Sequence, residues 1–103
     1  MGKDSEKKIL DKLKEEMPYL SSEFNVKRLA IFGSAAKGTL HKNSDIDLFI
    51  EFQKPIGFRF LILSEYMEKI LKRKVDILTP HGVDNIRVKE IADDIRRSLV
   101  YVS

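Results

Sequence analysis

The sequence predicts a small α/β (α+β) domain in which strands and helices alternate along 103 residues. Three short stretches have the alternation or the β-branched and aromatic content of strands, and three longer ones carry apolar residues at helical spacing. Hydrophobic residues make up 43% of the chain and charged residues 34%, which is ordinary for a globular domain and argues against disorder. This length has room for one domain, which we expect to span 1–103.

The first half of the chain is predicted to form a helix, a strand and a short second helix. Ser5 to Leu20 carries apolar side chains at helical spacing between charges, and Pro18 is expected to disturb the end of this helix. Val26 to Phe32 is a β-rich run that indicates a strand. Ser34 can then N-cap a short helix over Ala35 to Lys37. These segments form a strand, turn, helix unit.

The second half is predicted to contain two more strands and two longer helices. Asp45 to Phe52 alternates strictly between apolar and other residues over most of its length, which is typical of a half-buried strand. Phe58 to Arg73 has a helical pattern with two apolar stripes, of which one can face the sheet and the other is either covered by the first helix or a docking surface. Lys74 to Leu78 forms a short strand, and Asp84 can cap a last helix. The apolar end, Leu99 to Val102, can pack as helix or as extended chain.

Charge and composition exclude several classes of protein. The net charge of +3 is a mild basic excess that helps to attract phosphates but is too small for a dedicated nucleic-acid binder. Cysteine is absent, so disulfides and thiolate metal sites are excluded, and we expect a cytoplasmic location. No stretch approaches the length of a membrane span, so no membrane partner is expected.

Two carboxylates on the second predicted strand form a candidate metal site. Asp45 and Asp47 stand at positions i and i+2, so their side chains project from the same face while Ile46 and Leu48 enter the core. Two like charges held this close repel each other unless a cation lies nearby. Mg²⁺ suits such a pair because it binds one or two carboxylates together with substrate phosphates.

A glycine and a serine at the end of the first predicted strand form a candidate phosphate site. Gly33 permits close approach of the backbone, and Ser34 offers a hydroxyl and backbone N–H groups where an anion is favoured. A P-loop is excluded because Thr39 and Leu40 stand where Lys and then Ser or Thr are required. The expected site is therefore a phosphate-binding turn of another kind.

A third carboxylate can join this pair. Asp76 lies between apolar neighbours on the short third strand, so it points away from the core. If the second and third strands are neighbours in one sheet, Asp76 can form a three-carboxylate cluster with Asp45 and Asp47, and such a cluster could hold two metal ions.

Together these motifs resemble the DNA polymerase beta-like nucleotidyltransferase superfamily, and within it the minimal nucleotidyltransferases, or MNT proteins. The resemblance extends from Leu29 to Leu78 and includes the Gly-Ser turn, the Asp-hydrophobic-Asp strand about ten residues later and the later Asp. It implies a nucleotidyltransferase fold, with a small mixed three- to four-stranded sheet and helices packed on one side.

The resemblance also implies a role for each of these residues. Gly33 and Ser34 would bind phosphates of the incoming nucleotide, and Lys37, which stands where many relatives have Arg, would make a point-charge rather than a bidentate contact with phosphate. The metal-binding and catalytic residues would be the three carboxylates, with two Mg²⁺ ions as cofactors, and the third acid would help to activate the acceptor: Asp45, Asp47 and Asp76.

The short chain narrows the activity that the resemblance implies. Polymerases and antibiotic nucleotidyltransferases append domains that bind the acceptor, so here we expect the acceptor to come from a partner protein. MNT proteins are commonly encoded beside a HEPN-type toxin and act as its antitoxin. The resemblance thus implies transfer of a nucleotidyl group, most simply AMP, from Mg-ATP or another nucleoside triphosphate to a tyrosine of that toxin. The alternative is an antitoxin that neutralises its partner by contact without catalysis.

A third hypothesis is nucleic-acid binding through a cluster of basic residues at the end of the Phe58 to Arg73 helix. We expect this cluster to be a solvated helix end that complements the helix dipole, so nucleic acid is not expected to be a direct partner. The cluster consists of Lys69, Lys72, Arg73 and Lys74.

Overall fold

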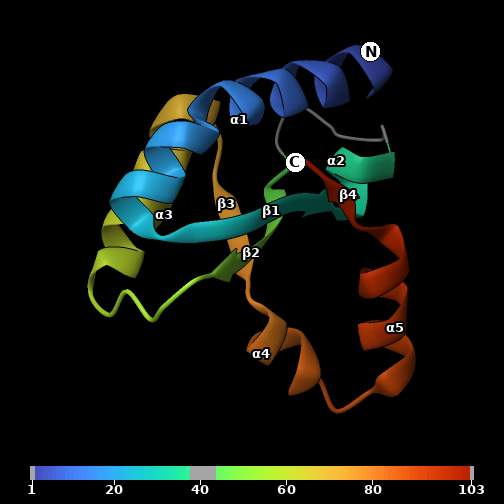
Figure 1. The fold of residues 1–103 in the computed structure, drawn as a ribbon. Helices are drawn as coiled ribbons and strands as arrows, with labels where there is room; N and C mark the ends of the chain where they lie inside the picture. The colour runs from blue at the N-terminus through green and yellow to red at the C-terminus, as the bar shows by residue number, and fades with distance from the viewer. Residues whose placement is uncertain (1, 38–43, 103) are drawn as a thin grey trace.

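The centre of the fold is a mixed four-stranded sheet in the order β3-β2-β1-β4 (Figure 1). The computed structural model describes residues 2–37 and 44–102, with side chains from residue 6 onward. β2 pairs with β1 in antiparallel and with β3 in parallel orientation, and β4 adds to the outer edge of β1 in antiparallel orientation. The predicted mixed sheet is confirmed. Its strands are β1 (Val26–Phe32), β2 (Ile46–Phe52), β3 (Val75–Leu78) and β4 (Val100–Tyr101).

Five helices accompany the sheet in the described residues, and the first is longer than predicted. α1 continues through Pro18 and ends at Phe24 rather than near Leu20. Leu20 and Phe24 are both buried in the core, and this burial outweighs the backbone hydrogen bond that proline removes. None of the helices in the described part is long and apolar enough to cross a membrane. The helices are α1 (Gly2–Phe24), α2 (Gly33–Lys37), α3 (Arg59–Leu71), α4 (Pro80–Asp84) and α5 (Lys89–Ser98).

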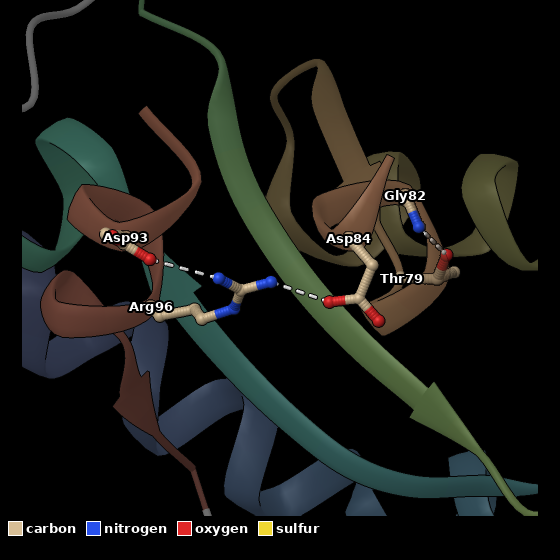
Figure 2. Close-up of polar contacts among 5 residues, drawn as sticks. All are labelled: Thr79, Gly82, Asp84, Asp93 and Arg96. Atoms are coloured by element: carbon tan, nitrogen blue, oxygen red, sulfur yellow. Dashed lines mark hydrogen bonds and ion pairs between the residues drawn. The ribbon is translucent and has the colours of Figure 1, made fainter. Parts of the chain in front are cut away.

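The segment after β3 also differs from its prediction, because it forms two helices instead of one. Thr79 caps α4: its Oγ1 accepts a hydrogen bond of 3.1 Å from the Gly82 N–H, and Pro80 occupies the first helical position (Figure 2). Asp84 ends α4 and does not cap α5, which begins at Lys89. The prediction of Asp84 as a cap was wrong, because a helix already begins after Thr79 and Asp84 is its last residue.

Apolar side chains pack on both faces of the sheet. The larger core lies between the sheet and helices α1 and α3, and it includes Leu13, Ile31, Leu48 and Leu63. A smaller core on the opposite face joins the sheet to α4 and α5, which lie together below the strands in Figure 1. Helices α1 and α3 pack on one side of the sheet, as predicted. Helices α4 and α5 also pack on the sheet, but on its opposite side. The smaller core contains Ala30, Phe32, Phe49, Val83 and Ala92.

The second apolar stripe of α3 is covered by the first helix at one end and exposed at the other. Tyr66 packs against Tyr19 of α1 with ring centroids 5.0 Å apart, and its hydroxyl donates a hydrogen bond to Glu16. This hydrogen bond, together with desolvation, raises the pKa of Tyr66 to about 12. Phe58 and Leu61, by contrast, remain largely exposed at the start of the helix. α1 therefore covers one end of the stripe and leaves the other in solvent.

Truncating Leu63 should test the larger core. Leu63 is fully buried, so Leu63→Ala is expected to lower the free energy of unfolding by about 2–5 kcal/mol. Leu61 is a matched control on the same helix, because it is 65% exposed and Leu61→Ala should cost less than about 0.5 kcal/mol. Urea denaturation of the two variants measures the difference, and equal losses would contradict the packing of α3.

Candidate active site

Strand register brings the predicted acidic residues together. Asp47 in the middle strand β2 is paired with Phe32 at the end of β1 and with Asp76 in β3. Paired positions on neighbouring strands lie about 5 Å apart, and Asp45 is placed two residues before Asp47. Because β2 and β3 are neighbouring strands, Asp76 lies beside Asp47, as the predicted three-carboxylate cluster requires. The acids lie on the face of the smaller core, on the same side as Phe49.

The backbone of Gly33 approaches the Asp47 carboxylate closely. Gly33 joins β1 to α2 with φ of +66°, a conformation that favours glycine. A Cβ atom added at this position would lie 2.3 Å from Oδ2 of Asp47. Glycine is thus required at position 33 for two reasons, backbone conformation and space for the carboxylate. The predicted phosphate turn and the predicted metal-binding strand are in direct contact.

The three carboxylates also interact electrostatically. The pKa of Asp47 is raised, first by partial burial of the carboxyl group and then by the negative charges of Asp76 and Asp45. A carboxyl group in this position is easier to protonate than usual because each neighbouring charge opposes its ionisation. A cation placed among these acids would relieve the repulsion.

Glu68 in α3 and Arg73, two residues after the end of α3, contact the starts of β2 and β3 near the acids. Arg73 donates from Nη1 to the carbonyl oxygen of Ser44 at 3.2 Å, directly before Asp45. Glu68 accepts a hydrogen bond of 3.2 Å at Oε2 from the Val75 N–H, directly before Asp76. Arg73, which the sequence placed in a solvated basic cluster, therefore supports the acidic site. Neither contact could be predicted from spacing, because both depend on where α3 packs.

Ser34 and Lys37, the other two residues predicted to bind phosphate, lie on α2. α2 begins at Gly33, two residues earlier than expected, so Ser34 lies inside the first turn and is not the N-cap. Ser34 is half-buried, and Lys37 is exposed in the last turn. Gly38, Thr39 and Leu40 lie outside the described residues.

The carboxylates are suited to a divalent ion whose remaining coordination positions are filled by phosphate oxygens. Among the described side chains, no group of three acidic, histidine or cysteine residues is arranged to hold a metal ion by itself. Oxygen donors from Asp45 and Asp47 nevertheless fit the usual pattern of Mg²⁺, in which one or two carboxylates act together with substrate phosphates. Burial, followed by the charges of Asp76 and Asp45, opposes ionisation of Asp47, so a cation that arrives with its substrate would stabilise the ionised carboxylate.

Comparison with known proteins decides the family. Residues 7–102 match the nucleotidyltransferase domain family. The chain belongs to this family. A candidate protein adenylyltransferase of Methanocaldococcus jannaschii, MJ1379, is 38% identical to this nucleotidyltransferase over 97 residues, which cover 91% of this chain and 94% of the relative. Nucleotidyltransferases of this family generally use divalent metal ions.

Solved structures show the same fold. A candidate minimal nucleotidyltransferase is similar with a TM-score of 0.67 and 23% identity, covering 88% of this chain and 93% of that one. An MNT antitoxin in complex with a tri-AMPylated HEPN toxin of Shewanella oneidensis is similar with a TM-score of 0.56 and 15% identity, covering 100% of this chain and 72% of that one. The predicted minimal nucleotidyltransferase fold is confirmed.

Adding a methyl group at Gly33 should damage the site beyond the cost of backbone strain. Gly33→Ala places Cβ against the Asp47 carboxylate, so it should lower the free energy of unfolding by more than the about 1–3 kcal/mol that backbone strain alone costs. Gly57→Ala is the matched control, because Gly57 has a similar φ of +57° but no atom within 4 Å of an added Cβ. Thermal unfolding of both variants measures the difference. Equal behaviour of the two variants would contradict the role of the contact.

Neutralising Asp47 should stabilise the metal-free nucleotidyltransferase. A raised folded-state pKa means that the stability associated with neutral Asp47 is complete below the unfolded-state pKa, near 3.8, and is lost as pH rises through the folded-state value. At pH 7 the ionised group therefore opposes folding, and Asp47→Asn should raise the free energy of unfolding.

The measurement is thermal unfolding in EDTA at pH 7 and again at pH 3, where the advantage of Asp47→Asn should shrink because the native carboxyl group becomes protonated. Asp94→Asn is the control, since Asp94 lies on the exposed surface of α5. A lower melting temperature of Asp47→Asn than of the unchanged chain at pH 7 would contradict the electrostatic account.

Proposed function

We propose that this nucleotidyltransferase transfers AMP from Mg-ATP to a tyrosine hydroxyl of a HEPN-type toxin and so acts as its antitoxin. The observation that carries the proposal is the register that aligns Asp47 with Asp76 directly beside Gly33. This arrangement supplies a place for a metal-bound triphosphate next to three acids. The name of the Methanocaldococcus jannaschii relative supports protein adenylylation, and the AMPylated HEPN toxin in the Shewanella oneidensis complex supports the class of acceptor.

In the proposed reaction the tyrosine oxygen attacks the α-phosphorus of ATP. A new phosphorus–oxygen bond forms to the tyrosine, the bond from the α-phosphorus to the bridging oxygen breaks, and pyrophosphate leaves. Bound divalent ions, two in our proposal, would neutralise phosphate charge and lower the pKa of the attacking hydroxyl. Asp45 and Asp47 would hold these ions. Asp76, on the neighbouring strand, would complete the site and help to remove the tyrosine proton.

The phosphate end of the nucleotide is proposed to lie at the start of α2. Gly33 has no side chain, so a phosphate group can approach its backbone closely. Ser34 follows with a hydroxyl group, and Lys37 supplies a positive charge at the other end of the same short helix. A lysine makes a point-charge contact and would tolerate some variation in where the phosphates lie.

The test is incubation of the purified chain with Mg²⁺, α-labelled ATP and the HEPN-type protein encoded beside it. We expect label on the HEPN protein, and we expect its loss in the Asp45→Asn/Asp47→Asn double variant by at least about a thousandfold in rate, because the metal-binding carboxylates are gone. A matched double variant, Asp11→Asn/Asp94→Asn, removes the same charge from exposed positions of α1 and α5 and should keep the activity.

The same variants separate catalysis from neutralisation by contact. If the Asp45→Asn/Asp47→Asn variant no longer labels the toxin and no longer neutralises its ribonuclease activity, the adenylylation mechanism is supported. If neutralisation persists without label, the chain acts by contact. Absence of label with the unchanged chain under each of the four nucleoside triphosphates would refute the proposed activity.

A further inference from the structure

A cavity on the acidic face of the sheet has no role in the proposed phosphate chemistry. It has a volume of about 290 Å³ and lies between the sheet, α4 and α5. Its walls are mainly apolar and include Phe49, Val83 and Leu99, while Tyr101 contributes an aromatic ring from β4. Arg96 and Asp84 add the charged part of the lining. The cavity therefore combines apolar surfaces with a donor and an acceptor.

The sheet register places this cavity next to the acids. Phe49 follows Asp47 by two residues in β2, so the two side chains share a face and their backbone positions are about 7 Å apart. Ala30 is paired with both Phe49 and Tyr101, so the two aromatic residues belong to one row across the sheet. Gly33 follows Phe32, the partner of Asp47, so the phosphate turn lies beside the acids on the side away from Phe49. The phosphate turn and the acids thus lie at one end of this face, and the cavity lies at the other.

Arg96 and Asp84 form the polar edge of the cavity. Nη2 of Arg96 in α5 lies 2.6 Å from Oδ1 of Asp84 in α4, and Nη1 lies 3.2 Å from Oδ1 of Asp93 (Figure 2). Figure 2 shows the arginine extending across β2 from one helix to the other, with the second oxygen of Asp84 turned away from it. Both side chains are partly exposed, so a ligand can reach them.

We propose that the cavity binds the base of the nucleoside triphosphate and favours a base with an amino group on its edge, such as adenine. The inference rests on the proposed function, because the phosphates must occupy the Gly33 end of the face. The apolar walls would contact the faces of the ring. The Asp84 carboxylate would accept a hydrogen bond from the amino group, and Arg96 would donate to a ring nitrogen. A carbonyl group in place of the amino group would face a carboxylate and be disfavoured.

The acceptor tyrosine fits the cavity less well than the base does. Its hydroxyl must reach the α-phosphate at the acids, so its ring would enter from the cavity with the polypeptide backbone behind it. A peptide backbone buried there would need partners for its N–H and C=O groups, and the walls other than Asp84 and Arg96 are mainly apolar. A base reaches the cavity through the ribose and brings no backbone with it.

The first test compares how substitution of each of two arginines on α5 changes the affinity for two ligands. Arg96→Ala is expected to weaken binding of Mg-ATP by about tenfold and to leave binding of Mg²⁺ with inorganic triphosphate unchanged, since triphosphate has no base. Arg97→Ala removes the same charge from an exposed position outside the lining, and it should leave both affinities unchanged. Calorimetric titration gives the affinities, and circular dichroism checks that each variant is folded. Equal effects of the two substitutions on ATP, or loss of triphosphate binding in Arg96→Ala, would overturn the proposal.

The second test uses ATP and ITP, which differ at one edge of the purine, where an amino group is replaced by a carbonyl. The unchanged chain should bind Mg-ATP about tenfold more tightly than Mg-ITP, and Asp84→Ala should abolish most of this preference. Equal affinity of the unchanged chain for ATP and ITP would refute the amino-edge contact. If the variants bind ATP normally while AMP transfer proceeds, the cavity proposal fails and the proposed function stands. If binding behaves as expected but no protein is labelled, the proposed function fails and the base site stands.

Discussion

The contact between the Asp47 carboxylate and the backbone of Gly33 is the constraint on which the site depends. It requires that β1 end beside the first half of β2, that Gly33 adopt φ of +66°, and that no side chain occupy the space taken by Oδ2 of Asp47. The same antiparallel register sets which β2 residue meets β3, because β2 lies between the two strands. A slip of one residue would turn Asp47 into the larger core and Leu48 toward the opposite face, where the acids now lie. The burial of Leu48 therefore also holds the acids in place.

The two hydrophobic cores have different roles in the domain. The larger one, under α1 and α3, fixes the strands, and the polar ends of α3 add hydrogen bonds at the starts of β2 and β3. The smaller one covers only part of the opposite face and leaves the acids at its margin. Burial of the Asp47 carboxyl group and the nearby charges of Asp76 and Asp45 oppose its ionisation, and the raised pKa of Asp47 reflects this combined cost. Packing on the far side of the sheet offsets it.

Much of the local structure followed from residue patterns. The strict alternation of Ile46 to Phe52 and the β-rich run of Val26 to Phe32 were sufficient to predict β2 and β1. Predictions were wrong where tertiary packing outweighed a local signal: α1 passes through Pro18 because Leu20 and Phe24 are buried, and Thr79, not Asp84, provides a helix cap. The apolar pattern at the end of the chain is compatible with both a helix and an extended chain. It is extended at Val100 and Tyr101 because these residues pair with the edge of β1.

Residue patterns were sufficient to identify the chemical parts of this protein: a glycine-serine turn, two carboxylates on one face of a strand and a third carboxylate on a later strand. Strand periodicity has a range of a few residues, so it could assign each side chain to a face. The folded arrangement was needed to show that Asp76 lies beside Asp47, that Arg73 and Glu68 support the acids, and that α4 and α5 enclose a cavity next to them. These relations join segments tens of residues apart, and they arise from sheet order and helix packing, which no local pattern specifies.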